Sequence, residues 1–209
     1  MKDLFKGCWT VPNLLTALRI VMVPIFAYLF VTGHIGWAVL VLALSGLSDF
    51  FDGKIARRFN QVSPLGKLLD PIADKLTQIT LAVLLYLTFR GATDTVLRAF
   101  SWVFLVFIVK EMVMVVGGAI MLAIGLRPGA AEIYGKIATF AFYAIMLLII
   151  AFGPEIGWFR HVFMLNSVVM IVLVCVSAVL TLVAFCSYMP ALRVQVKEHF
   201  AKKKEEKSE

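Results

Sequence analysis

The chain has 209 residues, of which 61% are hydrophobic and only 16% charged. This composition is too apolar for a soluble domain of this length and indicates an integral membrane protein. The net charge of +7 gathers beside the apolar stretches and in the C-terminal tail, so we expect contact with anionic lipid headgroups and no binding of nucleic acid. Three cysteines, an odd number, give neither a disulfide framework nor a metal-ligand spacing, and we expect buried thiols.

Six apolar stretches are long enough to cross a bilayer, whose hydrocarbon core needs about 20 helical residues. In chain order they are Leu14–Val31, Gly36–Phe51, Leu69–Phe89, Trp102–Ile124, Ile133–Phe152 and Phe163–Met189. The first contains Arg19 and Pro24 and lacks a small-residue cleavage site, so it is predicted to remain as a helix. The second is short and is predicted to continue into the polar sequence after it.

The predicted fold class is an all-α integral membrane protein with six transmembrane helices and a short interfacial N-terminal segment. The loops are too short for a second globular domain, so residues 1–209 are predicted to form a single membrane domain. Residues 196–209 are rich in Lys and Glu and are predicted to be a charged cytoplasmic tail, solvated and partly disordered.

Lys and Arg predict the orientation. Fourteen lie in the N-terminal segment, the loops after the second and fourth spans, and the tail, whereas the opposite loops carry three. This asymmetry places both termini in the cytoplasm. Arg19, Lys75 and Lys110 lie inside predicted spans and are expected to face the bundle interior. The short N-terminus without an Arg-rich leader favours a bacterial cytoplasmic membrane.

Four aspartates lie at the cytoplasmic ends of the second and third spans. Asp49 and Asp52 are three residues apart, and Asp70 and Asp74 are four apart, so each pair shares a helix face. Two carboxylates about 4 Å apart repel by roughly 4 kcal/mol at an effective dielectric near 20, so the cluster must hold protons or cations. Oxygen ligands without His or Cys favour Mg2+ or Mn2+ over zinc, and we predict two such ions.

The alternative is that these acids pair with neighbouring cations, of which Arg57, Arg58, Lys67 and Lys75 are available. Gly53 and Ala56 would let a flat ligand approach the helix backbone, although small residues also serve close helix contact in membranes. Arg57 offers planar donors that suit phosphate oxygens.

Eight of these positions fit the pattern D-x2-D-G-x2-A-R-x8-G-x3-D-x3-D, namely Asp49, Asp52, Gly53, Ala56, Arg57, Gly66, Asp70 and Asp74. The pattern resembles the signature of the CDP-alcohol phosphatidyltransferases. The resemblance implies that an alcohol hydroxyl attacks the phosphorus of a CDP-activated lipid and releases CMP. It also implies that the four aspartates bind Mg2+ or Mn2+, that Asp74 is the general base, and that Gly53, Ala56, Arg57 and Gly66 bind the donor nucleotide and phosphates.

The opening V-P-N-L-L-T-A-L-R-I at residues 11–20 is similar to the phosphatidylglycerophosphate synthase and cardiolipin synthase branch, which implies CDP-diacylglycerol as donor. The candidate acceptor contacts are Asn13, Thr16, Arg19, Lys67, Lys110 and Lys136. Asn13 and Thr16 could instead cap a helix. Lys67 and Lys136 could instead be interfacial lysines.

The first expectation for the acceptor is glycerol 3-phosphate, and the alternative is phosphatidylglycerol, as in cardiolipin synthases. K-E-M at residues 110–112 and Gly118 replace the R-E-F and later arginine typical of phosphatidylglycerophosphate synthases, and Glu111 could pair with Lys110. Gly117 and Gly118 suggest tight helix contact and, by analogy with the family, a homodimer. A non-catalytic transporter is a distant alternative, because the acids cluster at one membrane face beside small residues and an arginine.

Overall fold

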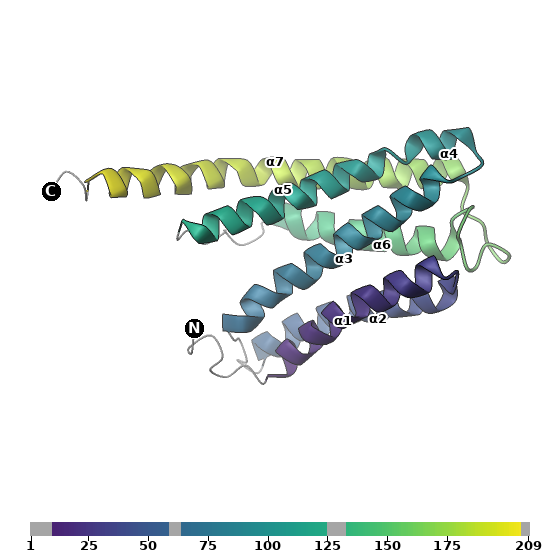
Figure 1. Ribbon diagram of the computed structural model, residues 1–209, viewed down its shortest axis with the longest axis horizontal. Helices are drawn as coiled ribbons and strands as arrows, with labels where there is room; N and C mark the ends of the chain where they lie inside the picture. The colour runs from purple at the N-terminus through teal and green to yellow at the C-terminus, as the bar shows by residue number, and fades with distance from the viewer. Residues whose placement is uncertain (1–9, 59–63, 125–132, 206–209) are drawn as a thin grey trace.

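The computed structural model describes residues 10–58, 64–124 and 133–205, and within them the secondary structure is helical throughout. The helices are α1 (Val11–Val31), α2 (Ile35–Arg58), α3 (Pro64–Arg90), α4 (Thr95–Phe100), α5 (Val103–Ala123), α6 (Ile133–Phe152) and α7 (Ser167–Glu205) (Figure 1). The start of α1, the end of α2 and the start of α3 lie near one another towards the left of Figure 1, and α7 ends on the same side of the bundle but extends well beyond them. The predicted motif therefore lies at the end of the bundle where the described chain begins and finishes.

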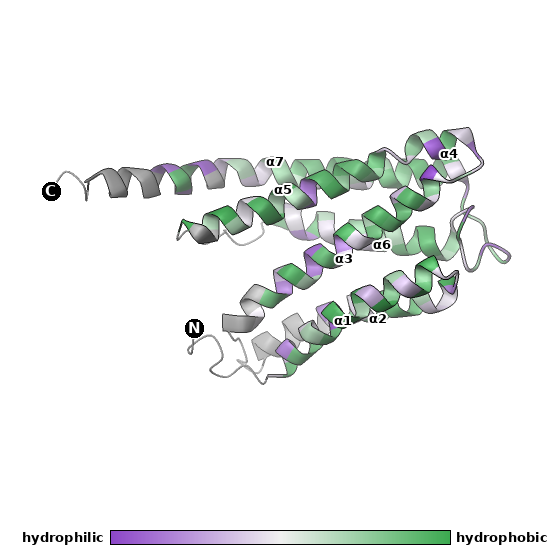
Figure 2. Cartoon of the chain, in the orientation of Figure 1, coloured by the Kyte–Doolittle hydropathy of each residue, from purple (hydrophilic) through white to green (hydrophobic). Residues whose placement is uncertain are grey.

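Five of these segments are long and apolar enough to cross a membrane: Val11–Val31, Leu69–Arg90, Thr95–Met121, Ile133–Phe152 and Ser167–Lys197. The apolar part of α2, Ile35–Asp49, is shorter. Apolar residues run along most of each helix, and polar residues concentrate at helix ends and on parts of α3 and α5 (Figure 2). The predicted class, an all-α integral membrane protein, is confirmed.

The long helices form a closed ring. α1 contacts α2 and α3, α3 contacts α5, α5 contacts α7, α7 contacts α6, and α6 returns to α2. α1 therefore lies beside both helices that carry the predicted acids. This position allows α1 to contribute side chains to the same site.

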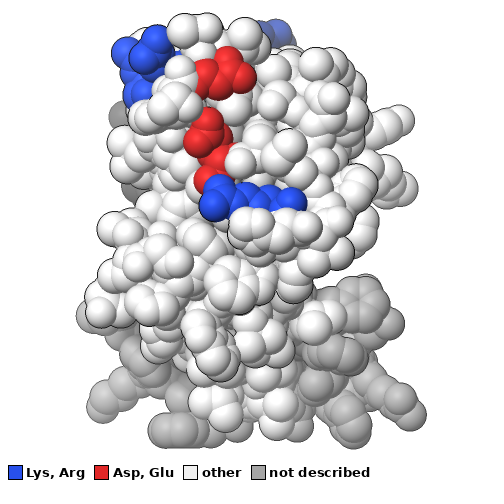
Figure 3. All heavy atoms as spheres, turned by 90° about the vertical axis from the view of Figure 1, so that its right-hand side faces the viewer, with Lys and Arg blue, Asp and Glu red and all other residues white. Residues whose placement is uncertain are grey.

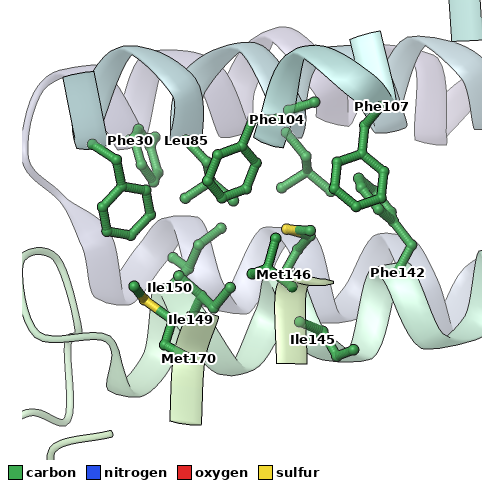
Figure 4. Close-up of a cluster of buried hydrophobic side chains, with 14 of the residues drawn as sticks. Phe30, Leu85, Phe104, Phe107, Phe142, Ile145, Met146, Ile149, Ile150 and Met170 are labelled. Carbon is green, nitrogen blue, oxygen red and sulfur yellow. The ribbon is translucent and has the colours of Figure 1, made fainter. Parts of the chain in front are cut away.

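An apolar cluster fills the ring towards the end opposite the motif (Figure 4). Phe104 and Phe107 from α5 face Ile149 and Met146 from α6, and Phe89 of α3 stacks on Phe104 with ring centroids 5.7 Å apart. Because lipid tails are as apolar as this cluster, its stabilising effect comes mainly from close van der Waals contact. The cluster holds the helices together beyond the polar motif end.

Local sequence sets several helix ends. The Thr10 side chain accepts a hydrogen bond from the Asn13 N–H at 3.4 Å and caps α1. Asp94 caps α4 through the Val96 N–H at 2.8 Å. Gly33 has φ +80° in the turn after α1, a conformation that side chains with a Cβ rarely adopt. α1 and α2 can therefore be joined by a very short turn.

The structure differs from two expectations, on the tail and the cysteines, and narrows two alternatives, on the paired glycines and the cap of α1. The charged tail is helical through Glu205, because α7 continues past the apolar span without a break. Cys175 and Cys186 are exposed on α7 rather than buried. A Cβ added at Gly117 or Gly118 would meet nothing within 4 Å, so these glycines serve no close contact within the described chain. Thr10, and neither Asn13 nor Thr16, is the cap of α1.

Candidate active site

The described carboxylates of the predicted motif lie where the ends of α2 and α3 meet α1. Asp49 on α2 keeps 49% of its side chain exposed, Asp74 on α3 keeps 31%, and Asp70 is exposed. Gly66 is buried. The predicted residues whose side chains lie outside the described part are Asp52, Gly53, Ala56, Arg57 and Lys67; the first four belong to the last turns of α2 and Lys67 to the first turn of α3.

One face of α1 contacts three of these acids. The Arg19 Nη1 atom lies 2.5 Å from Oδ1 of Asp49 and 3.5 Å from Oδ1 of Asp74. One turn earlier, the Thr16 hydroxyl donates to Oδ1 of Asp70 at 2.5 Å. Arg19 and Thr16 are both essentially buried, at 2% and 0% exposure. α1 thus supplies a cation and a hydroxyl donor to carboxylates from two other helices.

Asn13, Thr16 and Arg19 are each three residues apart and therefore share one face of α1. All three are buried, and Thr16 and Arg19 point to the motif acids. Their contact with the acceptor stays a prediction. Among the described side chains, the cation that pairs with Asp49 and Asp74 is Arg19 of α1 rather than a cation within or next to the motif.

A second charged network joins α3 and α5. Glu111 is only 3% exposed and forms two ion pairs. Its Oε2 lies 2.6 Å from Lys75 Nζ, and its Oε1 lies 2.5 Å from Lys110 Nζ. The expected Lys110–Glu111 pair is confirmed, and so is the inward position of the charged residues of the spans. Sequence reasoning missed the bridge to Lys75, although an acid and two lysines within apolar stretches were the available signal.

Tyr143 of α6 also reaches this region. Its hydroxyl donates to the backbone carbonyl oxygen of Asp74 at 3.3 Å, which ties α6 to the acid-bearing part of α3. A mid-span tyrosine was the only sequence signal for this contact. Lys136, one of the predicted acceptor contacts, is exposed near the start of α6.

The acids fit a hard divalent cation by donor type, although the described part of the chain contains no group of three or more His, Cys, Asp or Glu side chains close enough to hold a metal ion. The fourth predicted ligand, Asp52, lies outside the described side chains. The guanidinium of Arg19 already lies within reach of Asp49 and Asp74, so two carboxylates from different helices converge on one position of positive charge. Carboxylate oxygens are the ligands that Mg2+ and Mn2+ prefer.

A cavity of about 870 Å³ lies at the opposite end of the bundle, between the α1–α2 turn, the end of α3 and the segment after α6. Its wall includes Phe30, Leu87, Glu155, Trp158 and Arg160. This end shows a few acidic and basic side chains on a largely uncharged surface (Figure 3). No residue of the predicted motif lines the cavity, so the charged contacts at the other end define the candidate site.

The model of the CDP-alcohol phosphatidyltransferase family matches residues 9–183. The chain is similar to a cardiolipin synthase (CMP-forming) of Streptomyces coelicolor, with 41% identity over 156 residues, 71% of this chain and 68% of that protein. It is 37% identical over 135 residues to a putative cardiolipin synthase of Mycobacterium tuberculosis, which covers 64% of this chain and 60% of the relative.

It also resembles a CDP-diacylglycerol–glycerol-3-phosphate 3-phosphatidyltransferase of Blochmanniella floridana, with 41% identity over 85 residues, 39% of this chain and 44% of that protein. The match to the Mycobacterium relative spans less than two thirds of that protein, and the match to the Blochmanniella relative spans less than half. The family match, in contrast, includes all the motif residues and the helices α1 to α6. The chain belongs to the CDP-alcohol phosphatidyltransferase family.

Proposed function

We propose that this protein transfers the phosphatidyl group of CDP-diacylglycerol to a hydroxyl of an acceptor lipid and releases CMP. The observation that carries the proposal is the convergence of Asp49, Asp70 and Asp74 on the buried face of α1, through Arg19 and Thr16. Charged groups inside a membrane domain are costly and usually mark functional sites, so three carboxylates and a buried guanidinium at one end of an apolar bundle support a catalytic role.

In the proposed reaction, the acceptor oxygen forms a bond to the phosphorus that carries diacylglycerol, and the bond from this phosphorus to CMP breaks. Asp74 takes the hydroxyl proton, a role that requires a carboxylate within hydrogen-bond reach of the acceptor. Asp49, Asp52, Asp70 and Asp74 would hold Mg2+ or Mn2+, which when bound would neutralise the diphosphate and stabilise the leaving oxygen. The Tyr143 hydrogen bond to the Asp74 carbonyl would help to keep this turn of α3 in place.

Phosphatidylglycerol is the acceptor that the charges favour. A phosphomonoester such as glycerol 3-phosphate carries about −1.5 to −2 charges at neutral pH, whereas the phosphodiester of phosphatidylglycerol carries one. The ammonium groups of Lys75 and Lys110 both form ion pairs with Glu111. Less positive charge therefore remains to neutralise a second negative charge on the acceptor phosphate. The relatives that match over most of the chain are also named as cardiolipin synthases.

Glycerol 3-phosphate is the second candidate. It is supported by the Blochmanniella relative and by Lys136, which is exposed near the start of α6, a segment at the motif end of the bundle.

The test is an acceptor panel with purified full-length protein in lipid vesicles, CDP-diacylglycerol, and Mg2+ or Mn2+. Release of CMP is measured with phosphatidylglycerol, glycerol 3-phosphate, serine, inositol phosphate or no acceptor. We expect CMP and cardiolipin only with phosphatidylglycerol. Turnover with glycerol 3-phosphate alone would reject the acceptor assignment and keep the reaction, whereas no CMP with any acceptor would reject the reaction itself. Parallel assays in chelator test the metal requirement.

A further inference from the structure

A single buried arginine joins the acid-bearing ends of two helices. Arg19 of α1 places Nη1 2.5 Å from Asp49 of α2 and 3.5 Å from Asp74 of α3. Its side chain is 2% exposed, whereas those of Asp49 and Asp74 are 49% and 31% exposed. The carboxylates thus remain open to solvent on one side, and the guanidinium approaches them from the buried side.

The oxygens that Arg19 contacts belong to the set that would bind metal. Each of these carboxylate oxygens forms an ion pair with the guanidinium and is held by its positive charge. A divalent ion on the same oxygens would be repelled by the guanidinium charge at this short separation. Full occupancy of both positions is therefore electrostatically unfavourable.

We propose that Arg19 is a built-in counter-ion that competes with the divalent metal for Asp49 and Asp74. This inference rests on the proposed metal-dependent function. In the metal-free protein, the Arg19 guanidinium offsets the repulsion between carboxylates of α2 and α3 and keeps the two helix ends together. Metal binding replaces these contacts, so the intrinsic affinity of the acids for metal is reduced by the free energy of the Arg19 pairs.

Thr16 provides a different kind of contact and a matched comparison. Its hydroxyl has one hydrogen and lies near two acceptors, Asp70 Oδ1 at 2.5 Å and the Pro12 carbonyl oxygen at 3.0 Å. A neutral hydroxyl that donates to a ligand carboxylate orients it without adding positive charge. Loss of the Thr16 hydroxyl should therefore weaken metal binding, whereas loss of the Arg19 charge should strengthen it.

The experiment measures Mn2+ binding to the full chain in lipid nanodiscs, without donor or acceptor, from the electron paramagnetic resonance signal of free Mn2+. We compare wild type with Arg19→Gln, Arg19→Lys, Thr16→Val and the control Arg98→Gln on α4. We expect Arg19→Gln to bind Mn2+ about 10- to 100-fold more tightly, as removal of a charge-assisted pair implies. Arg19→Lys should lie between, Thr16→Val should bind more weakly, and Arg98→Gln should match wild type.

Equal or weaker Mn2+ binding by Arg19→Gln would overturn the competition. If no chain binds Mn2+, the proposed metal dependence fails first, and the inference falls with it. If Arg19→Gln does not fold, an NMR measurement on the wild-type protein still tests the proposal. Arginine-selective 15N NMR should show the Arg19 side-chain signal, assigned by its absence in Arg19→Lys, shift on addition of Mg2+. An Arg19 signal that stays in place while Mg2+ binds would reject displacement.

Discussion

Glu111→Gln is expected to destabilise the bundle strongly, because Glu111 is the shared partner of two lysines inside the membrane domain. The glutamine keeps the size of the side chain and removes its charge. Lys75 and Lys110, which now approach the same carboxylate at 2.6 and 2.5 Å, would then face each other without it.

The magnitude follows from burial. Removal of one partner of a buried ion pair typically costs about 3 to 5 kcal/mol. The Lys75 and Lys110 side chains keep 24% and 14% of their surface exposed and can move partly towards water or lose a proton, so we expect the lower value, about 3 kcal/mol. At about 2 to 4 °C per kcal/mol, the scale for soluble chains of this size, the melting temperature should fall by roughly 6 to 12 °C.

The assay is thermal unfolding in detergent, followed by intrinsic fluorescence and by the monodisperse fraction in size-exclusion chromatography. Glu155→Gln, in the segment after α6, is the control and should change stability by less than about 0.5 kcal/mol. The double variant Glu111→Gln/Lys110→Met should recover part of the loss, because it removes one of the two repelling ammonium groups. A melting temperature for Glu111→Gln within 2 °C of wild type, set against the scale above, would refute the buried network.

Three further predictions concern the site, the backbone and the orientation. Asp74→Asn should lower CMP release by about 10²- to 10⁴-fold with a far smaller effect on donor binding. The control Asp94→Asn, at the opposite end of the bundle, should leave turnover unchanged. A loss of less than about tenfold for Asp74→Asn would reject Asp74 as the general base. Gly157→Ala should lower the melting temperature, since its Cβ would lie 2.5 Å from the Gly153 carbonyl oxygen, whereas Gly117→Ala, with open space, should raise stability by up to about 1 kcal/mol. A fluorescent protein fused to the C-terminus should fluoresce in cells and an alkaline phosphatase fusion should be inactive, and the reverse pattern would contradict a cytoplasmic motif.

The sequence by itself determined the class of the fold and the family. Hydropathy is a local property, so the apolar stretches predicted helices whose bounds agree closely with α1, α5 and α6. The acid motif is also local, because its eight positions fall within 26 residues of each other. Pattern and composition therefore identified the reaction class without knowledge of which helices are neighbours.

The extent of two helices depended on more than local hydropathy. α2 continues through Arg58 and α7 through Glu205, well beyond their apolar parts. A polar sequence can continue a helix already held in place by its neighbours, because each added residue gains a backbone hydrogen bond without a new nucleus. Composition suggested a partly disordered tail because it does not include this effect.

Only the tertiary structure decided which charges meet. Arg19 could have paired with any intramembrane acid, and Lys75 lies next to Asp74 in sequence yet pairs with Glu111. The ring order places α1 between α2 and α3 and places α5 beside α3, which brings Arg19 to Asp49 and Asp74 and brings Lys75 to Glu111. A charged side chain in an apolar bundle pairs with an opposite charge that the helix arrangement brings close to it. No local sequence pattern specifies that arrangement.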